Sequence, residues 1–231
     1  MRYRRLILIP GYGLGPRSWG PLLRDLDPPP SQEVVCYRYD AISLQRGARA
    51  VSVLDALADR LRSDLADPRP TLVVAFSLGT AVLGAALRAD AAPAGIVTIG
   101  GLPGPEPMSE AYAAIADDLP RTHGHDRSLA ALSAETEDGQ MRVATELASF
   151  PLPLRQQLAT STTVSSTRQS TTIPWLLVLG RSDRILVASH EAGLDHLTSQ
   201  GSTVVIDGGH AVHLDAPTAT AEAIRAWAGH R

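Results

Sequence analysis

The sequence contains no lysine, because all 21 of its basic residues are arginines. A Schiff base to pyridoxal phosphate or to a carbonyl substrate needs a lysine amine, and so does a Walker-type phosphate loop. Cysteine is almost as scarce, and Cys36 is the only one. An internal disulfide is therefore impossible, and no cysteine cluster can hold zinc or an iron–sulfur centre. We expect Cys36 to be a small buried residue in a strand.

Long apolar runs are also missing. The run from Leu6 to Ile9 follows a basic N-terminus but stops at Pro10, whereas a secretory signal needs roughly 7 to 15 apolar residues. No other segment approaches the length of a membrane span. The net charge is -3 and no basic run occurs, so nothing supplies the phosphate-neutralising surface that nucleic-acid binding requires. The sequence predicts a cytoplasmic protein with no membrane or nucleic-acid partner.

The residues that are present alternate in the manner of an α/β protein. Of the 231 residues, 44% are hydrophobic and 19% are charged, which is enough to form one sizeable core. Short apolar runs alternate with longer amphipathic stretches, which predicts a mostly parallel sheet with helices on both faces. The six expected strands are residues 4–9, 33–39, 71–76, 95–99, 174–179 and 202–206. The expected helices are residues 18–26, 44–65, 79–89, 187–200 and 218–228.

The alternation stops between residues 101 and 172, where no convincing strand occurs. Helical patches are expected at 108–119 and 139–147, and the polar tract 160–172 is typical of a linker that returns to the core. We interpret 101–172 as an insertion into a core made of residues 1–100 and 173–231.

The strongest functional motif is a strand followed by Ala75-Phe76-Ser77-Leu78-Gly79 and then a helix. A turn this tight needs small residues two positions before and after the serine, and it lifts the hydroxyl clear of the sheet at a helix N-terminus. Such a turn is a nucleophile elbow. The alternative is that Ser77 merely caps the helix that follows, which serine does well.

A second motif is the glycine-rich loop Pro10-Gly11-Tyr12-Gly13, which follows the first expected strand. Glycine-rich loops let backbone N–H groups approach an oxyanion, and we assign those donors to Tyr12 here and to Leu78 after the serine. A dinucleotide fingerprint is the alternative, with Asp40 as the ribose-binding acid. In that fingerprint, however, the third glycine would fall on Pro16.

Two further candidates follow later strands. The expected strand 174–179 is followed by Gly-x-x-Asp, which places Asp183 just after the strand end. His210 follows the last expected strand, directly after two glycines. A carboxylate at this position would orient an imidazole and stabilise its protonated form. Alternatively, Asp183 caps a turn and His210 is an ordinary loop histidine. The order Ser77, Asp183, His210 at successive strand ends favours a catalytic triad.

These motifs together make the chain resemble the α/β-hydrolase superfamily. The resemblance rests on Pro-Gly-Tyr-Gly at 10–13, Ala-Phe-Ser-Leu-Gly at 75–79, Gly-Arg-Ser-Asp at 180–183 and Gly-Gly-His-Ala-Val-His-Leu-Asp-Ala-Pro at 208–217. It implies that His210 is the base and that His213 has a supporting or packing role. Within the superfamily the chain looks most like small esterases of the pimeloyl-carrier methyl-ester esterase type. We expect Gly11, Tyr12, Gly101 and Leu102 to bind substrate.

The resemblance also predicts how the fold is arranged. Many relatives carry a hairpin before the oxyanion strand, whereas here that strand begins almost at Met1, so a shortened sheet of about six strands is expected. Relatives usually have a histidine where this chain has Pro10, a change in loop packing that leaves the chemistry intact. By the same resemblance, residues 101–172 form a helical lid.

Polar residues of the predicted lid suggest no further site. His123 and His125 lack the carboxylate cluster of a metal site and are interpreted as solvated loop residues, and no metal is expected. Arginines at 121, 127, 142 and 155 offer a surface for an acyl carrier. Because this region holds nine acidic residues and five arginines, a solvated face is favoured instead.

The predicted activity is that of a serine hydrolase, with an acyl-enzyme on Ser77 and no cofactor. Its substrate would be a small or medium carboxylic ester or thioester, possibly a carrier-bound acyl group. Three alternatives stay open. A lyase, cyclase or cofactor-free oxygenase of the same fold would use the same residues as acid and base. A binding module would keep the pocket without turnover, and a nucleotide-binding protein would use the glycine-rich loop.

Overall fold

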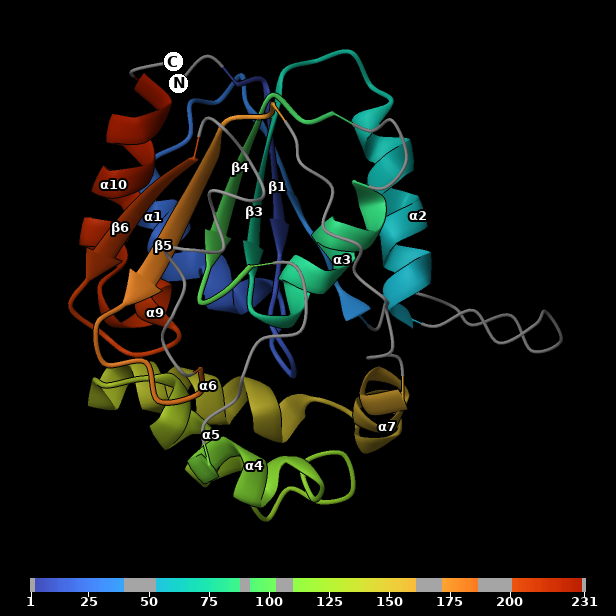
Figure 1. The fold of residues 1–231 in the computed structure, drawn as a ribbon, viewed down its shortest axis with the longest axis vertical. Coiled ribbons are helices and arrows are strands. Elements are labelled where there is room, and N and C mark those ends of the chain that lie inside the picture. Colours follow the sequence, from blue (N-terminus) through green and yellow to red (C-terminus); the bar gives the residue numbers. More distant parts are fainter. Residues whose placement is uncertain are drawn as a thin grey trace, which may run out of the picture.

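A computed structural model describes residues 3–39, 53–87, 92–102, 110–160, 172–186 and 201–229. Its centre is a six-stranded sheet in the order β2-β1-β3-β4-β5-β6, in which every neighbouring pair is parallel (Figure 1). The strands are β1 (Arg5–Ile9), β2 (Glu33–Cys36), β3 (Thr71–Phe76), β4 (Gly95–Ile99), β5 (Trp175–Gly180) and β6 (Gly201–Ile206). The six predicted strands and the shortened sheet are therefore confirmed.

Both faces of the sheet are covered, because successive residues of a strand point to opposite sides. In β1, Leu6 and Leu8 belong to one apolar core, and Ile7 and Ile9 belong to the other. The first core packs under α1 (Gly20–Leu26) and α10 (Pro217–Gly229), and the second under α2 (Val53–Leu65) and α3 (Leu78–Ala86) (Figure 1). Buried on both sides, the central strands are continuous apolar runs, as a covered parallel sheet requires.

Two predictions about β2 were wrong. The strand ends at Cys36 instead of residue 39, although the Tyr37 N–H still donates to the Leu8 carbonyl at 2.8 Å. Cys36 itself is half-buried, not buried. The reason is that β2 is an edge strand whose first residues, Glu33 and Val34, are exposed.

The helices largely follow the amphipathic stretches. A 3₁₀ turn, η1 (Pro16–Trp19), precedes α1, and a short α9 (Val212–Asp215) precedes α10. The expected helices 18–26, 79–89 and 218–228 correspond to η1 with α1, to α3 and to α10. The expected helix 44–65 corresponds to α2 from residue 53 onwards, and residues 44–52 lie outside the described residues. The expected helix 187–200 and Asp40 lie outside the described residues. No helix among the described residues is both long and apolar enough to span a membrane.

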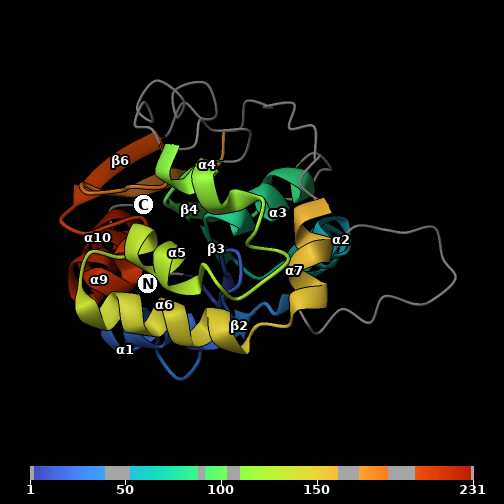
Figure 2. The same cartoon turned by 90° about the horizontal axis from the view of Figure 1, so that it is seen from below.

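Four helices lie across the C-terminal ends of the strands, as Figures 1 and 2 show together, and we call them the four-helix layer. They are α4 (Glu110–Ala116), α5 (Asp126–Ser133), α6 (Glu137–Ser149) and α7 (Leu152–Thr160). Sequence patterns indicated α4 and α6 but missed α5 and α7. Of the predicted linker 160–172, residue 160 is the last of α7, and residues 161–171 lie outside the described residues. That this layer acts as a lid stays a prediction.

Helices α5, α6 and α7 and the turn after α4 meet around a buried ion pair. Arg155 is fully buried and its Nη1 lies 2.6 Å from Oδ1 of Asp126, while its Nη2 lies 3.0 Å from Oδ2. The same guanidinium donates to the carbonyls of Leu119 and Leu147. The expectation that Arg155 is a solvated surface residue was therefore wrong. Its partners come from three other segments, which the sequence alone does not bring together.

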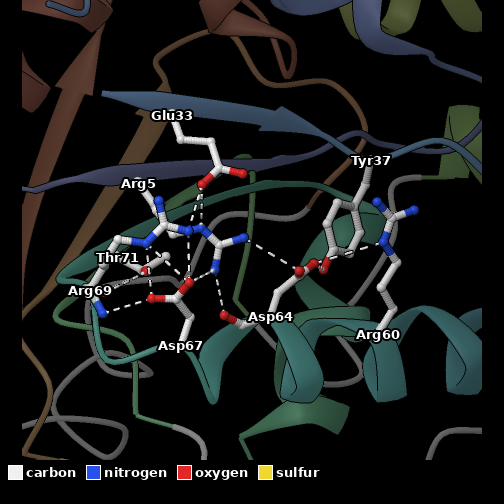
Figure 3. A network of polar contacts seen from close by, with 8 residues as sticks. All are labelled: Arg5, Glu33, Tyr37, Arg60, Asp64, Asp67, Arg69 and Thr71. Atoms are coloured by element: carbon white, nitrogen blue, oxygen red, sulfur yellow. Dashed lines mark hydrogen bonds and ion pairs between the residues drawn. The ribbon is translucent and has the colours of Figure 1, made fainter. Parts of the chain in front are cut away.

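A second polar cluster lies at the N-terminal ends of the strands, which we call the starting edge of the sheet (Figure 3). Arg5 of β1 is almost fully buried, and its Nε lies 3.1 Å from a carboxylate oxygen of Glu33 in β2. It also donates to the Asp64 carbonyl at 2.5 Å, at the end of α2. Arg69, which precedes β3, binds both Glu33 and Asp67. We call Arg5, Glu33, Asp64, Asp67 and Arg69 the starting-edge cluster, because it joins the beginnings of three strands.

Candidate active site

Ser77 lies in the tight turn between β3 and α3. Its φ is 49° and its ψ is -118°, a conformation that non-glycine residues rarely adopt and that marks backbone strain. The Ser77 N–H donates to the carbonyl of Ile99 in β4 at 3.0 Å, and its carbonyl accepts from Thr80. The predicted elbow is confirmed in its backbone geometry, which presents the hydroxyl at the edge where the parallel strands end.

Gly79 shows why this turn needs small residues. A Cβ atom at this position would lie 2.5 Å from the Ile9 carbonyl oxygen and 2.8 Å from that of Pro10. Both oxygens belong to the backbone at the end of β1, which cannot move without disturbing the sheet. The glycine of the motif is therefore required by close approach of two chain segments.

The three residues of the predicted triad lie in one hydrogen-bonded line. His210 Nε2 is 2.9 Å from Ser77 Oγ, and His210 Nδ1 is 2.7 Å from Oδ2 of Asp183. The imidazole is buried, with 2% of its residue surface exposed, and it packs on the Phe76 ring at 5.1 Å between centroids. Side chains from the ends of β3, β5 and β6 thus meet at one point.

Asp183 is held in place by its own loop. Its Oδ1 accepts from the N–H groups of Ile185 at 2.8 Å and Leu186 at 3.0 Å. Burial alone would raise the pKa of the Asp183 carboxyl, but the hydrogen bond and charge of His210, together with these two N–H groups, lower it below its ordinary value. The carboxylate is therefore ionised at neutral pH and suited to orient an imidazole.

The predicted oxyanion donors lie beside the elbow. Leu78 is the first residue of α3, so its N–H is among those that a helix leaves without a partner of its own. Gly11 precedes Tyr12, and a Cβ at Gly11 would lie 3.2 Å from Ser77 Cβ. The loop after β1 therefore runs directly past the serine. The roles of the Tyr12 and Leu78 N–H groups stay predictions.

The remaining predicted substrate residues also lie close to the elbow. Leu102, beyond β4, is buried, and its carbonyl accepts from Thr80 Oγ1 at 3.2 Å. Gly101 is the preceding residue and is also buried. The Tyr12 side chain faces the four-helix layer, and burial raises the pKa of its hydroxyl to about 12, with the charge of Arg155 opposing. Substrate contact by Gly11, Tyr12, Gly101 and Leu102 stays a prediction.

Comparison with known sequences identifies the family. Residues 6–223 match the Alpha/beta hydrolase family. The chain belongs to the α/β-hydrolase family. A search of curated proteins finds no match, so the esterase type suggested by the sequence is unconfirmed.

Solved structures of other α/β-hydrolases share the fold. A putative aryl esterase from Burkholderia cenocepacia superimposes with a TM-score of 0.75 at 19% identity, covering 99% of this chain and 90% of that one. A thermophilic esterase from Thermogutta terrifontis gives 0.75 at 21%, covering 98% and 89%. A 2-hydroxy-6-oxo-6-phenylhexa-2,4-dienoate hydrolase from Rhodococcus sp. strain RHA1 gives 0.75 at 18%, covering 98% and 91%. At such identities the likeness concerns the fold alone.

The glycine-rich loop of this α/β-hydrolase is poorly suited to a dinucleotide. Backbone N–H groups of such a loop would have to face the pyrophosphate, but the Gly15 N–H donates to a carboxylate oxygen of Glu146 in α6 at 2.9 Å. A fixed negative charge at this position repels a phosphate. The geometry therefore argues against the nucleotide-binding alternative.

His213 packs behind the candidate site. It is fully buried, 4.6 Å from the Phe76 ring and 4.8 Å from the Trp19 ring between centroids. Burial, together with the charge of His210, lowers the pKa of His213 to about 3. A neutral imidazole in this apolar setting acts as a packing residue.

A hollow of about 380 Å³ lies on the outer side of Asp183, lined also by Glu135, Gln140, Ser182 and Arg184. Ser77 does not line it, so we do not assign it to the substrate. Just before α5, His123 Nδ1 lies 2.7 Å from Oδ2 of Asp126. Within the described part of the chain, no three histidine, cysteine or acidic side chains gather as a metal site would require.

Sequence reasoning missed one polar residue next to the site. Asp215, at the end of α9, accepts from the N–H of Gly209, the residue before His210. It also binds residues that precede α6. Its place in the quoted motif 208–217 was visible in the sequence, but its partners 79 and 80 residues earlier were not.

Proposed function

We propose that this α/β-hydrolase is a serine hydrolase that cleaves a small or medium carboxylic ester or thioester. The observation that carries the proposal is the line from Ser77 Oγ through His210 to Asp183, with contacts of 2.9 and 2.7 Å. A serine whose hydroxyl contacts a buried imidazole, itself held by a carboxylate, is the arrangement that activates an alcohol as a nucleophile.

In the proposed reaction, Ser77 Oγ attacks the acyl carbonyl while His210 Nε2 accepts its proton. Asp183 stabilises the resulting imidazolium, and the N–H groups of Tyr12 and Leu78 bind the oxyanion. His210 then donates the proton to the departing alcohol or thiol. Water attacks the acyl-enzyme with His210 again as base, which releases the acid and restores the serine.

The charges of the four-helix layer favour a free substrate over a carrier-bound one. Docking of an acidic carrier requires unpaired cations. Three of the four arginines considered for docking are instead paired: Arg142 lies 2.7 Å from Asp138, Arg121 lies 3.9 Å from Asp118, and Arg155 is buried against Asp126. The fourth, Arg127, is exposed, and one cation is too few for such docking. Two of the solved structures named above, the aryl esterase from Burkholderia cenocepacia and the esterase from Thermogutta terrifontis, agree with ester cleavage. We therefore assign a small free ester or thioester as the substrate class.

A fluorophosphonate probe tests the proposal. We expect the intact mass of the wild type to rise by one adduct, and Ser77→Ala to stay unlabelled, because only an activated serine reacts. Ser182→Ala, which alters the serine immediately before Asp183 in the loop after β5, is the matched control and should label like the wild type. Hydrolysis of short nitrophenyl esters and acyl thioesters should then be lost in Ser77→Ala alone.

A folded wild-type protein that remains unlabelled would contradict the proposal. In that case the same residues would act as acid and base in a non-hydrolytic reaction, such as that of a lyase, cyclase or cofactor-free oxygenase. Folding would be checked in the same sample by circular dichroism.

A further inference from the structure

The carboxylate of Asp215 accepts four hydrogen bonds from two distant segments. Oδ2 accepts from the N–H groups of Gly209 and Glu135, both at 2.8 Å. Oδ1 accepts from the N–H of Thr136 at 2.9 Å and from its hydroxyl at 2.7 Å. Each oxygen therefore has two donors, and the set joins the loop of His210 to the start of α6. We call these four bonds the Asp215 clasp.

The α6 side of the clasp is a helix N-terminus. Thr136 is the N-cap of α6, and its hydroxyl accepts from the Gly139 N–H at 3.0 Å. A Cβ at Gly139 would collide with Oδ1 of Asp215, so the carboxylate rests directly against the first turn. A negative charge is stabilised at this end of a 13-residue helix, which adds to the hydrogen bonds.

On the other side, the residues immediately before and after His210 are both held by hydrogen bonds. The Gly209 N–H is bound by Asp215, and the Ala211 N–H donates to the Ser133 carbonyl at 2.6 Å. A Cβ at Gly209 would lie 3.0 Å from that same carbonyl oxygen, and the opposite side of Gly209 packs on Gly180 of β5. The backbone of His210 is thus enclosed between a strand end and residues 133–136.

We propose that Asp215 is a positioning residue that sets the orientation of His210, and that residues 133–136 are a fixed part of the active site. The proposal rests on the proposed function, because it assigns to Asp215 the alignment of the imidazole with Ser77 and Asp183. Asp215 acts through the backbone of Gly209 and touches neither the serine nor the imidazole in the contacts described above.

Asp215→Asn isolates this role with little change in shape. An amide offers one acceptor oxygen in place of two. In either orientation its NH₂ group faces two N–H or O–H donors, either those of Gly209 and Glu135 or those of Thr136. The clasp therefore opens on one side. Asp207→Asn is the matched control, since it removes a charge from the same loop, where Asp207 is exposed and pairs with the exposed Arg181 at 2.7 Å.

We expect kcat for a short nitrophenyl ester to fall about 10- to 100-fold in Asp215→Asn with KM changed less than about 3-fold, because misalignment of a catalytic group weakens the transition state only. Asp207→Asn should keep the wild-type kcat. All proteins are compared well below their unfolding temperatures. Under these conditions, substitution of a merely structural residue would lower the unfolding temperature and leave kcat unchanged.

A proton NMR signal provides a readout that does not need turnover. The Nδ1 proton of His210, shared with Asp183, should give a far-downfield resonance that is absent in His210→Gln. In Asp215→Asn this resonance should shift or broaden, whereas in Asp207→Asn it should match the wild type. If the wild type reacts with no fluorophosphonate, the proposed function fails, while this comparison still decides the role of Asp215.

Thr136→Val is a second variant that tests the same proposal if Asp215→Asn does not fold. It removes the hydroxyl bond to Asp215 at 2.7 Å and the helix cap on the Gly139 N–H, and it leaves the carboxylate and its bond to Gly209 in place. It should lower kcat in the same direction by a smaller factor. An unchanged kcat together with an unchanged downfield resonance, in either folded variant, would overturn the assignment of Asp215 as a positioning residue.

Discussion

Two histidines three residues apart have opposite chemical settings in this protein. The imidazole of His210 contacts a serine hydroxyl and a carboxylate, whereas the His213 ring is enclosed by Trp19 and Phe76. Among the described residues, neither ring nitrogen of His213 has a hydrogen-bond partner. A proton on His213 would therefore be a buried and unpaired charge, which explains why only His210 is suited to proton transfer.

His213 makes the folded state sensitive to mild acid. Its pKa is about 3 when folded, against about 6.5 for an unfolded histidine. Between these values the unfolded chain binds a proton that the folded chain does not, so stability is full above about pH 6.5 and declines as pH falls. Between pH 7.5 and pH 5, we expect the unfolding free energy of His213→Leu to fall by about 2 kcal/mol less than that of the wild type.

Urea unfolding of each variant at the two pH values measures this difference. His125→Leu is the matched control, because its imidazole is about one-third exposed, with 37% of the side chain accessible. It should keep the wild-type pH dependence. The lowered pKa of Asp183 affects stability only below about pH 4, where an unfolded aspartate begins to bind protons, and does not enter this range. An unchanged slope in His213→Leu would contradict the assignment.

The individual site residues were predictable to different extents. Ser77, Asp183 and His210 stand in local motifs at strand ends, and their mutual contacts follow from a parallel sheet that brings those ends together. The role of Asp215 was not predictable, since its donors Glu135 and Thr136 belong to an insertion whose fold the local pattern does not determine.

At the scale of elements, the four-helix layer is organised by one buried charge. Arg155 of α7 is bound by Asp126 of α5 and donates to the carbonyl of Leu147, the residue of α6 that contacts Gly13 of the glycine-rich loop. The sequence predicted helices here only in part, because α5 and α7 are short and their apolar faces complete a core formed by other segments. Strands β1 and β3, in contrast, are apolar after their first residues, Arg5 and Thr71, and were recognised directly.

Replacement of Arg155 by methionine should destabilise the protein strongly. The change leaves Asp126, of which only 5% is exposed, without its main partner, and breaking a buried ion pair costs about 3–5 kcal/mol. Arg142→Met makes the same substitution at an exposed pair with Asp138 and should cost less than about 1 kcal/mol. Guanidinium unfolding of both variants measures the difference.

A double variant, Arg155→Met with Asp126→Leu, separates charge from packing. Because it removes both buried charges, we expect it to recover a large part of the stability lost in Arg155→Met. If the single variant is as stable as Arg142→Met, the ion pair does not organise the layer.

At the scale of the whole molecule, the starting-edge cluster and the candidate active site lie at opposite ends of the strands. The starting-edge cluster joins β1, β2 and β3 where they begin (Figure 3), while Ser77, Asp183 and His210 gather where the strands end. The six-stranded parallel order itself was predictable, since continuous apolar runs alternate with amphipathic ones. The exposed edge position of β2 was not, because strand order does not follow from chain order.

Arg5→Gln should therefore lower stability without changing catalysis. The side chain of Arg5 is 5% exposed and binds Glu33 and Asp64, so its loss should cost about 2 kcal/mol, less than a fully buried pair because both partners reach solvent. Ester kcat at 25 °C should remain that of the wild type. Arg4→Gln, at the exposed neighbouring position, should alter neither quantity. A reduced kcat in folded Arg5→Gln would show that the two edges are coupled.

The order of the strands along the chain also determines when a hydrolase of this kind becomes reactive during synthesis. Strands β1, β2 and β3 are neighbours in the sheet and leave the ribosome first, so the turn that holds Ser77 can form early. The imidazole that contacts Ser77, however, belongs to His210, which lies 133 residues further along the chain, after β6. Under the proposed function, we therefore expect a nascent or prematurely released chain to carry a serine of ordinary reactivity until the final strand has joined the sheet.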